Sequence, residues 1–211
     1  TLRMMAGALC TVLTLLALGK APEQCLTRDS PWFCHDLDCP HYEVVTDIVD
    51  DVELRAYDAG MWVSTNLTGM DYDEAVRTGF MRLFSYISGA NQERQRIEMT
   101  APVRVDMTPG AGPFCEDHFQ VSFYVPNHLQ DDPPLPLSKD VFLDPAPATS
   151  YYVLSYGGRT NEKEIVDKAT DLVQLLNDAD LPYEFTSFYH AGYDSPFRLF
   201  NRHNEVWIKA L

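Results

Sequence analysis

A helix predicted over residues 71–89 carries more apolar surface than it needs to bury one face. On a wheel of about 100° per residue, its apolar arc continues past the buried face through Phe80 and Phe84 and reaches Arg77 and Met81. An apolar shelf edged by a cation suits a flat ligand with carboxylates, such as a dianionic tetrapyrrole, because guanidinium groups bind carboxylates bidentately. The alternative is that Phe80 and Phe84 pack under a loop and Arg77 is a solvated cation.

A second group of polar residues lies near the C-terminus. It comprises Arg198, Asn201, Arg202, Asn204 and Glu205. This cluster could clamp an anion, or its amide and carboxylate groups could fix the turn into the strand that contains Trp207. We predict the structural role for Asn204, Glu205 and Trp207, and both interpretations stay open for Arg198.

No catalytic pattern accompanies these residues. The sequence has no nucleophile elbow, no phosphate-binding glycine loop and no His-x-x-x-His pair. Its clustered carboxylates fit helix caps and solvated turns, for example Asp71 at a helix start and Asp131 in a turn. We therefore predict a protein that is not an enzyme.

Four of the five cysteines follow the apolar N-terminal segment. They are Cys25, Cys34, Cys39 and Cys115. Four thiols in an exported chain favour two disulfides, with three possible pairings. Three of the four lie in residues 20–41, which are rich in Cys, Pro and Asp and predict a disulfide-tethered extension. The alternative is a zinc site of Cys34, His35, Cys39 and His41, although this spacing matches no zinc finger.

Residues 1–19 have the features of a secretory signal peptide. Arg3 precedes an apolar run over residues 6–18, and small residues follow where a signal peptidase cleaves. The run is short for a membrane span, and Lys20 follows it without a stop-transfer pattern. We therefore predict a secreted, extracellular protein without integral membrane association.

The composition limits the partners of the chain. Its 211 residues carry a formal net charge of −15, and such an acidic surface repels phosphate backbones, so nucleic acid is a poor partner. Asn66-Leu67-Thr68 is a glycosylation sequon. In an exported chain it predicts a glycan on Asn66, and an unmodified turn is the alternative.

The elements that must position these groups fall within residues 42–211, which predict one α+β domain. Alternating apolar residues predict strands over residues 44–57, 61–67, 97–107 and 119–125, and Asp71 with Glu74 predicts the start of the first helix. The second half repeats this order, with strands at 141–143 and 151–156, a helix at 161–177, and strands at 183–189 and 205–209. This repeat predicts a pseudo-twofold architecture.

The chain resembles the SOUL family of heme-binding proteins over this whole domain. The resemblance rests on the C-terminal segment Ala191-Gly192-Tyr193-Asp194-Ser195-Pro196-Phe197-Arg198, on Trp62-Val63-Ser64-Thr65 and Met99-Thr100-Ala101-Pro102-Val103, and on Gly110-Ala111-Gly112-Pro113-Phe114. It implies a distorted antiparallel β-barrel flanked by two α-helices.

The resemblance also implies a ligand and its site. In one branch of the family, the first helix and a basic residue of the C-terminal segment are proposed to line a heme site, at positions held here by Arg77 and Arg198. A lysine of that helix is replaced by Ser85, and a histidine attributed to the iron in another branch is replaced by Ala56. Because alanine has no lone pair, we expect weak, reversible binding of heme or a related porphyrin.

A rival function uses the same fold differently. Ala56, Ser85 and the added cysteines favour an extracellular protein-interaction module that has lost tight heme binding. The apolar arc beside Arg77 and the retained Arg198 favour the heme-binding protein, which we predict.

Overall fold

The computed structural model describes residues 30–49, 51–69, 71–108 and 118–211. The predicted signal peptide, Cys25 and Cys115 lie outside the described residues. The described strands are β1 (Tyr42–Val49), β2 (Val52–Tyr57), β3 (Gly60–Thr68), β4 (Val103–Thr108), β5 (His118–Tyr124), β6 (Phe142–Ala146), β7 (Thr149–Tyr156), β8 (Tyr183–Gly192) and β9 (Asn204–Ala210). The helices are α1 (Tyr72–Ile87) and α2 (Glu162–Asp178), with 3₁₀ turns η1 (Trp32–Cys34) and η2 (Asn127–Leu129).

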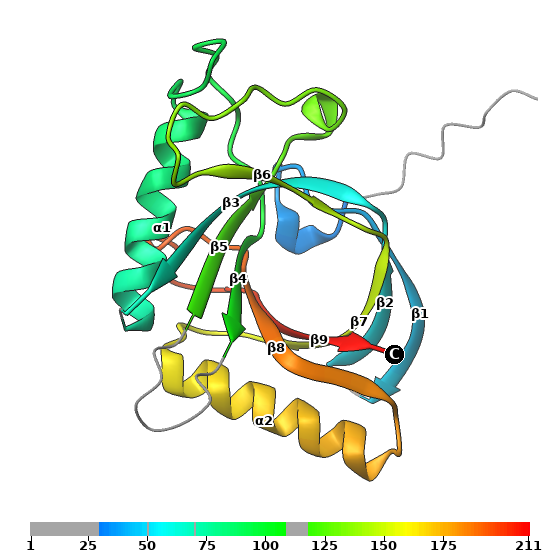
Figure 1. Cartoon of the computed structure of the whole chain (residues 1–211). Helices are drawn as coiled ribbons and strands as arrows, with labels where there is room; N and C mark the ends of the chain where they lie inside the picture. The colour runs from blue at the N-terminus through cyan, green and yellow to red at the C-terminus, as the bar shows by residue number, and fades with distance from the viewer. Residues whose placement is uncertain (1–29, 50, 70, 109–117) are drawn as a thin grey trace, which may run out of the picture.

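These strands form one antiparallel sheet in the order β1-β2-β7-β9-β8-β4-β5-β3-β6. The sheet curls strongly, so that its two halves face each other (Figure 1). Its edge strands β1 and β6 do not pair with each other, so the ladder of the described strands is open. The fold is therefore α+β, with a curled open sheet rather than a closed ladder.

One corner joins the two halves of the sheet. Strand β2 continues into β3, and β6 continues into β7, each across a two-residue bend. Tyr57 lies opposite Thr149 on one side of the corner, and Gly60 lies opposite Ala146 on the other. Both pairs have the same register, so the pairing of the two bent strands is in register on both sides of the corner.

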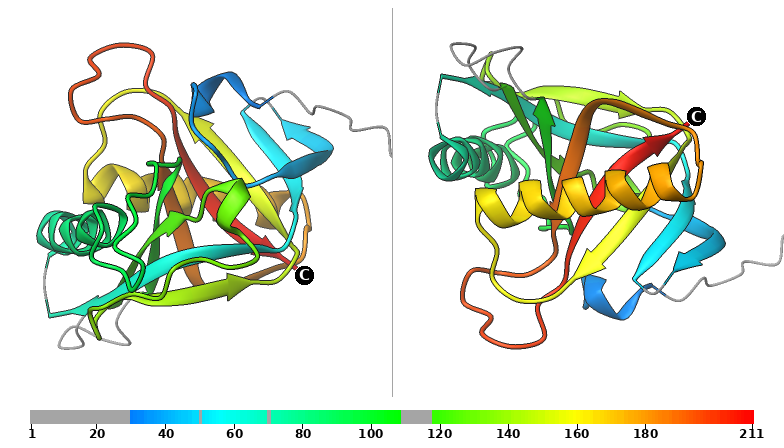
Figure 2. Two further views of the ribbon diagram at one scale, coloured as in Figure 1. Left: turned by 90° about the horizontal axis from the view of Figure 1, so that it is seen from above. Right: turned by 90° about the horizontal axis from the view of Figure 1, so that it is seen from below.

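Both helices cover the outer face of the curled sheet, α1 over β3 and β5 and α2 over β8 and β9 (Figure 2). The predicted start of α1 is confirmed, because the Asp71 carboxylate accepts a hydrogen bond from the backbone N–H of Glu74 at 2.8 Å. Asn161 caps α2 in the same way, through the N–H of Glu164 at 3.0 Å.

Two apolar clusters lie on the two faces of the sheet. The larger cluster lies under the helices and includes Leu83 of α1, Leu172 of α2 and Val121 of β5. Helix α1 approaches closely here, since a Cβ atom on Gly79 would lie 2.6 Å from Val121. The smaller cluster lies on the opposite face, within the curl, and contains Trp207, which is 1% exposed.

The strand predicted over residues 97–107 is the main error in the secondary structure. The structure begins β4 only at Val103, and residues 96–102 are irregular. Pro102 explains the difference, because proline has no N–H to donate to a ladder and ends regular pairing. The run predicted over residues 44–57 divides into β1 and β2, with Asp51 at a φ of 65° in the turn.

Candidate functional site

A pocket of about 550 Å³ lies beside α1, on the flank that faces β3 and the segment before β6. It brings together Arg77 and Met81, two of the predicted site residues. We call it the Arg77 pocket, and its lining residues are Arg77, Thr78, Met81, Arg82, Ser85, Tyr86, Ala90, Pro136, Ser138 and Val141. Two cations and no carboxylate are among them, although the whole chain is acidic.

Arg82 supplies the second cation of the Arg77 pocket. Its Nη1 donates to Thr65 Oγ1 at 3.2 Å and to the carbonyl of Asn66 at 3.3 Å, which fixes the guanidinium over β3. Neither acceptor is charged, so these contacts leave the positive charge of Arg82 available to an anion. Sequence reasoning missed Arg82, because on the helical wheel it lies near the buried face.

The other functional groups of the pocket are weak acids or soft donors. The Tyr86 hydroxyl donates to the carbonyl of Pro134 at 2.7 Å. Burial, helped by the charge of Glu93, raises the pKa of Tyr86 to about 12, so the phenol stays protonated. Met81 is 58% exposed and presents the thioether as a soft donor. The pocket therefore offers binding groups rather than a nucleophile or a base.

Phe80 and Phe84 are not among the residues that line the Arg77 pocket. Their rings stack at 5.9 Å, and the half-buried Phe80 also packs against Phe123 of β5. Phe84 lines a second pocket, of about 680 Å³, beside the N-terminal segment. The charged residues that line this second pocket are Asp36, Asp38, Arg96 and Glu98. Such a lining disfavours a dianion, so Phe84 contributes to a pocket that does not suit a tetrapyrrole.

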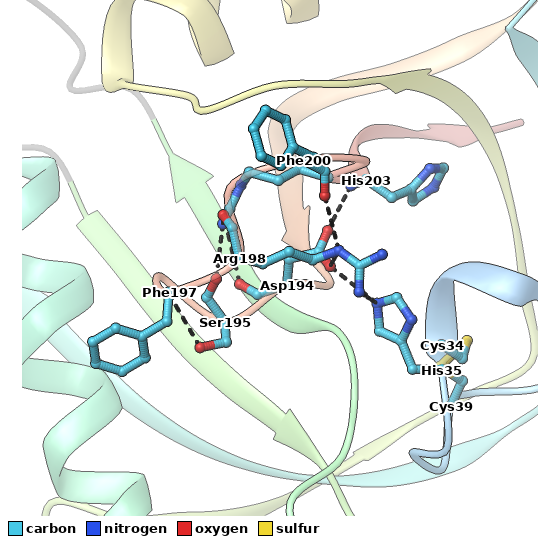
Figure 3. A network of polar contacts seen from close by, with 10 residues as sticks. Cys34, His35, Cys39, Asp194, Ser195, Phe197, Arg198, Phe200 and His203 are labelled. Carbon is cyan, nitrogen blue, oxygen red and sulfur yellow. Dashed lines mark hydrogen bonds and ion pairs between the residues drawn. A yellow bond between two sulfur atoms is a disulfide. The ribbon is translucent and has the colours of Figure 1, made fainter.

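Arg198 lies away from α1, in the segment between β8 and β9 (residues 193–203), which we call the C-terminal loop. Its Nε lies 3.2 Å from Asp194 Oδ1 and donates to the carbonyl of Phe200 at 3.0 Å (Figure 3). Its Nη1 lies 3.4 Å from Nε2 of His35. Arg198 thus holds the loop together and is not among the residues that line the Arg77 pocket.

The described part of the extension forms a hook over residues 30–41. The Cys34–Cys39 disulfide closes it (Figure 3). Phe33 stacks on His203 of the C-terminal loop with ring centroids 4.0 Å apart. The bridge confirms one of the predicted disulfides and joins two residues of the hook itself. It also consumes both thiolates of the alternative zinc site.

Glu205 has the structural role that we predicted. It is fully buried in β9, and its carboxylate accepts hydrogen bonds from four side chains, those of Arg55, Tyr193, His203 and Trp207. Burial alone would disfavour the carboxylate anion. The hydrogen bond from His203 and the charge of Arg55 overcome that penalty and lower the pKa of Glu205 to about 2.

The described histidines lie outside the Arg77 pocket, and so does Ala56 in β2. His190 of β8 is the most enclosed of them. Its Nδ1 lies 2.7 Å from the hydroxyl of Tyr72, and its buried Nε2 has no hydrogen-bond partner in the described structure. Burial lowers the pKa of His190 to about 4, so the imidazole is neutral at pH 7.

Asn66, the predicted glycan site, lies within β3 rather than in a turn. The Asn66 side chain is exposed, and the backbone of Asn66 pairs with Gln120 of β5. An exposed carboxamide is compatible with a glycan, which stays a prediction.

Comparison with known proteins places this chain in a family. Residues 37–209 match the family described as SOUL heme-binding protein. Heme-binding protein 2 of Homo sapiens is 40% identical over 156 residues, which are 74% of this chain and 76% of that protein. Heme-binding protein 1 of Xenopus tropicalis is 31% identical over 156 residues, 74% of this chain and 82% of that protein. The chain belongs to the SOUL heme-binding protein family.

Solved structures with little sequence identity share the fold alone. The C-terminal domain of EcmrR superimposes with a TM-score of 0.56 at 10% identity, covering 81% of this chain and 98% of that one. A hydrolase encoded by lin2189 from Listeria innocua gives a TM-score of 0.52 at 9% identity, covering 76% and 92%. In the described part of this chain, no helix is long and apolar enough to cross a bilayer.

Proposed function

We propose that this protein binds heme or a related tetrapyrrole reversibly, and without catalysis, in the Arg77 pocket. One observation carries the proposal: two arginines and no carboxylate line an otherwise largely apolar pocket of about 550 Å³. Pockets of several hundred Å³ with apolar walls and few polar groups are typical of small-molecule sites. The names of the heme-binding relatives support the same ligand class.

The residues of the pocket divide the work of holding such a ligand. The guanidinium groups of Arg77 and Arg82 would bind the propionates, and the side chains of Met81, Pro136 and Val141 would cover the ring. No histidine or cysteine lines the pocket, and the family position attributed to an iron ligand is Ala56. The bound group would supply its own iron or ring chemistry, and weak binding follows because this chain contributes few strong ligands.

We also propose that the protein acts outside the cell. The Cys34–Cys39 disulfide supports this location, because disulfides persist mainly in oxidising compartments. The apolar segment within residues 1–19 and the sequon at Asn66 agree with export. A protein there would carry or buffer heme.

The proposal is tested by titrating hemin into the glycosylated, disulfide-intact protein and following the Soret band. Saturable one-to-one binding is expected. Arg77→Ala and Arg82→Ala should each weaken it at least about tenfold, since each removes a charge-assisted hydrogen bond worth about 1.5–3 kcal/mol. Arg96→Ala is the matched control, because Arg96 is exposed and lines the acidic pocket instead.

Two outcomes would redirect the search. Saturable binding that is indifferent to Arg77 and Arg82 would place the ligand elsewhere, and Phe84→Ser would then test the second pocket. No saturable binding would favour the rival function, an extracellular protein-interaction module. The division of the predicted shelf between two pockets, with Arg77 and Met81 in one and Phe84 in the other, is the observation that favours this rival.

A further inference from the structure

The C-terminal loop exposes large apolar side chains that the Arg77 pocket does not use. Phe197 is 91% exposed, Leu199 is 66% exposed and Phe200 is 79% exposed. Single exposed apolar residues are ordinary, but three within four positions concentrate apolar surface in one loop, and we call these three side chains the patch; their exposure gains nothing in the folded monomer. Figure 2 shows that this loop projects beyond the sheet and the helices. The patch therefore points to a partner.

The loop holds this patch in a fixed shape. The guanidinium of Arg202 donates to the carbonyls of Ser195, Arg198 and Asp194, which ties the loop together from within. The Asp194 carboxylate accepts from the backbone N–H of His203 at 2.6 Å. From outside the loop, Arg159 donates to the carbonyl of Pro196. Several polar contacts thus fix the backbone of a loop that exposes three apolar side chains to solvent.

The charge of the loop differs from that of the rest of the chain. Its residues 193–203 contain two arginines, Arg198 and Arg202, against one carboxylate, Asp194, whereas the whole chain has a net charge of −15. Phe and Leu in a loop that carries more arginine than carboxylate match surfaces that enter the boundary between headgroups and acyl chains. Trp32 of the hook, 65% exposed, lies against the base of the loop at 5.6 Å from His203. Tryptophan favours the same boundary.

We propose that the tip of the C-terminal loop docks this protein reversibly onto a zwitterionic phospholipid bilayer, with Phe197, Leu199 and Phe200 inserted at the headgroup level. The surface fits a bilayer because its apolar side chains project outward, whereas a small ligand needs a concave site. Zwitterionic lipid is the partner because the acidic body of the protein repels anionic membranes.

The test uses the full chain and vesicles of phosphatidylcholine. Trp32 is a built-in probe, since the other two tryptophans, Trp62 and Trp207, are 3% and 1% exposed. We expect vesicles to shift tryptophan fluorescence to the blue and to sediment the protein. Phe197→Ser with Phe200→Ser should lower the partition coefficient at least about tenfold, because burying one Phe contributes about 1.5–3 kcal/mol.

Phe185→Ser is the matched control, because Phe185 is 47% exposed on β8 and should leave vesicle binding unchanged. Hemin binding should be equal in all these variants, so this test is separate from that of the Arg77 pocket. Vesicle binding that is unchanged by the double substitution would overturn the proposal. A native protein that does not bind the vesicles would overturn it as well. A native dimer that the double substitution dissociates would also overturn it, because a second copy would then cover the tip.

Discussion

Single buried ionisable groups control how this protein responds to acid. The pKa of Glu205 and the pKa of His190 are both lower than usual for their residue types, for opposite reasons. Hydrogen bonds and a cation stabilise the charged form of Glu205, whereas burial without a charged partner stabilises the neutral form of His190. The two residues therefore affect stability over different ranges of pH.

Glu205→Gln should strongly destabilise the protein at pH 7. The substitution removes the carboxylate that pairs with the buried guanidinium of Arg55, and breaking a buried ion pair costs about 3–5 kcal/mol of folding stability. Because the folded pKa is about 2, below the ordinary 4.5, the stabilisation is complete above pH 4.5 and is lost as the pH falls toward 2. Denaturant unfolding measures this, and Glu184→Gln at the exposed pair with Lys209 is the control. Equal losses in the two variants would contradict the prediction.

His190→Leu should flatten the dependence of stability on pH between 6.5 and about 4. The unfolded chain binds a proton near pH 6.5, but the folded imidazole binds one only near pH 4, so the native protein loses stability as the pH falls through this range. From pH 7 to pH 5 the native loss due to His190 should be about 2 kcal/mol. Unfolding at both pH values measures it, with the exposed His128→Leu as control. A variant that keeps the full native loss would refute the assignment.

At the scale of the elements, the position of α1 depends on Gly79, which has no side chain. Gly79 brings the helix onto Val121 of β5, and α1 in turn carries both arginines of the Arg77 pocket. The contact between helix and sheet therefore sets the distance between those arginines and the rest of the pocket.

Gly79→Ala should destabilise the protein although alanine favours helices. The added Cβ would lie 2.6 Å from Val121, so α1 or the strand must shift, and overpacking of this kind costs about 1–3 kcal/mol. Thermal unfolding measures the loss, and hemin affinity should fall with it. Ser85→Ala on the exposed face of α1 is the control for stability and should be neutral or slightly stabilising. A more stable Gly79→Ala protein would contradict this account of the packing.

Local signals in the sequence predicted the elements better than they predicted the pocket. Asp71 and Asn161 mark both helix starts, because a cap is a contact between residues three positions apart. The error at residues 97–102 arose because apolar alternation outweighed the effect of Pro102. The pocket was predicted in part, since the wheel identified Arg77 and Met81. Its second wall, from Pro136 to Val141, comes from a distant segment without a periodic signal, so that wall could not be inferred. Arg82 was missed because on the wheel it lies near the buried face.

At the scale of the molecule, the hook packs on the curled sheet and on the C-terminal loop, but not on the Arg77 pocket. Phe33 and His35 of the hook contact the C-terminal loop, while the Arg77 pocket contains no residue of the hook. Release of the hook should therefore change the C-terminal loop and leave the pocket intact.

Cys34→Ser with Cys39→Ser should loosen the hook without abolishing hemin binding. Removing a crosslink between residues five positions apart costs about 2 kcal/mol by the chain-entropy relation. Hydrogen exchange should accelerate at residues 30–41 and in the C-terminal loop, while α1 exchanges as before. Unchanged protection of the hook would show that its packing, through Phe33 and Trp32, suffices without the bridge.

The matched corner of the sheet has a consequence for how this family can change in length. Residues 58–59 and residues 147–148 face each other across the bend, and the pairs on both sides share one register. A one-residue insertion in either bend would turn every later side chain of that strand to the opposite face. Insertions and deletions at these two sites, far apart in the chain, should therefore occur together across relatives or not at all.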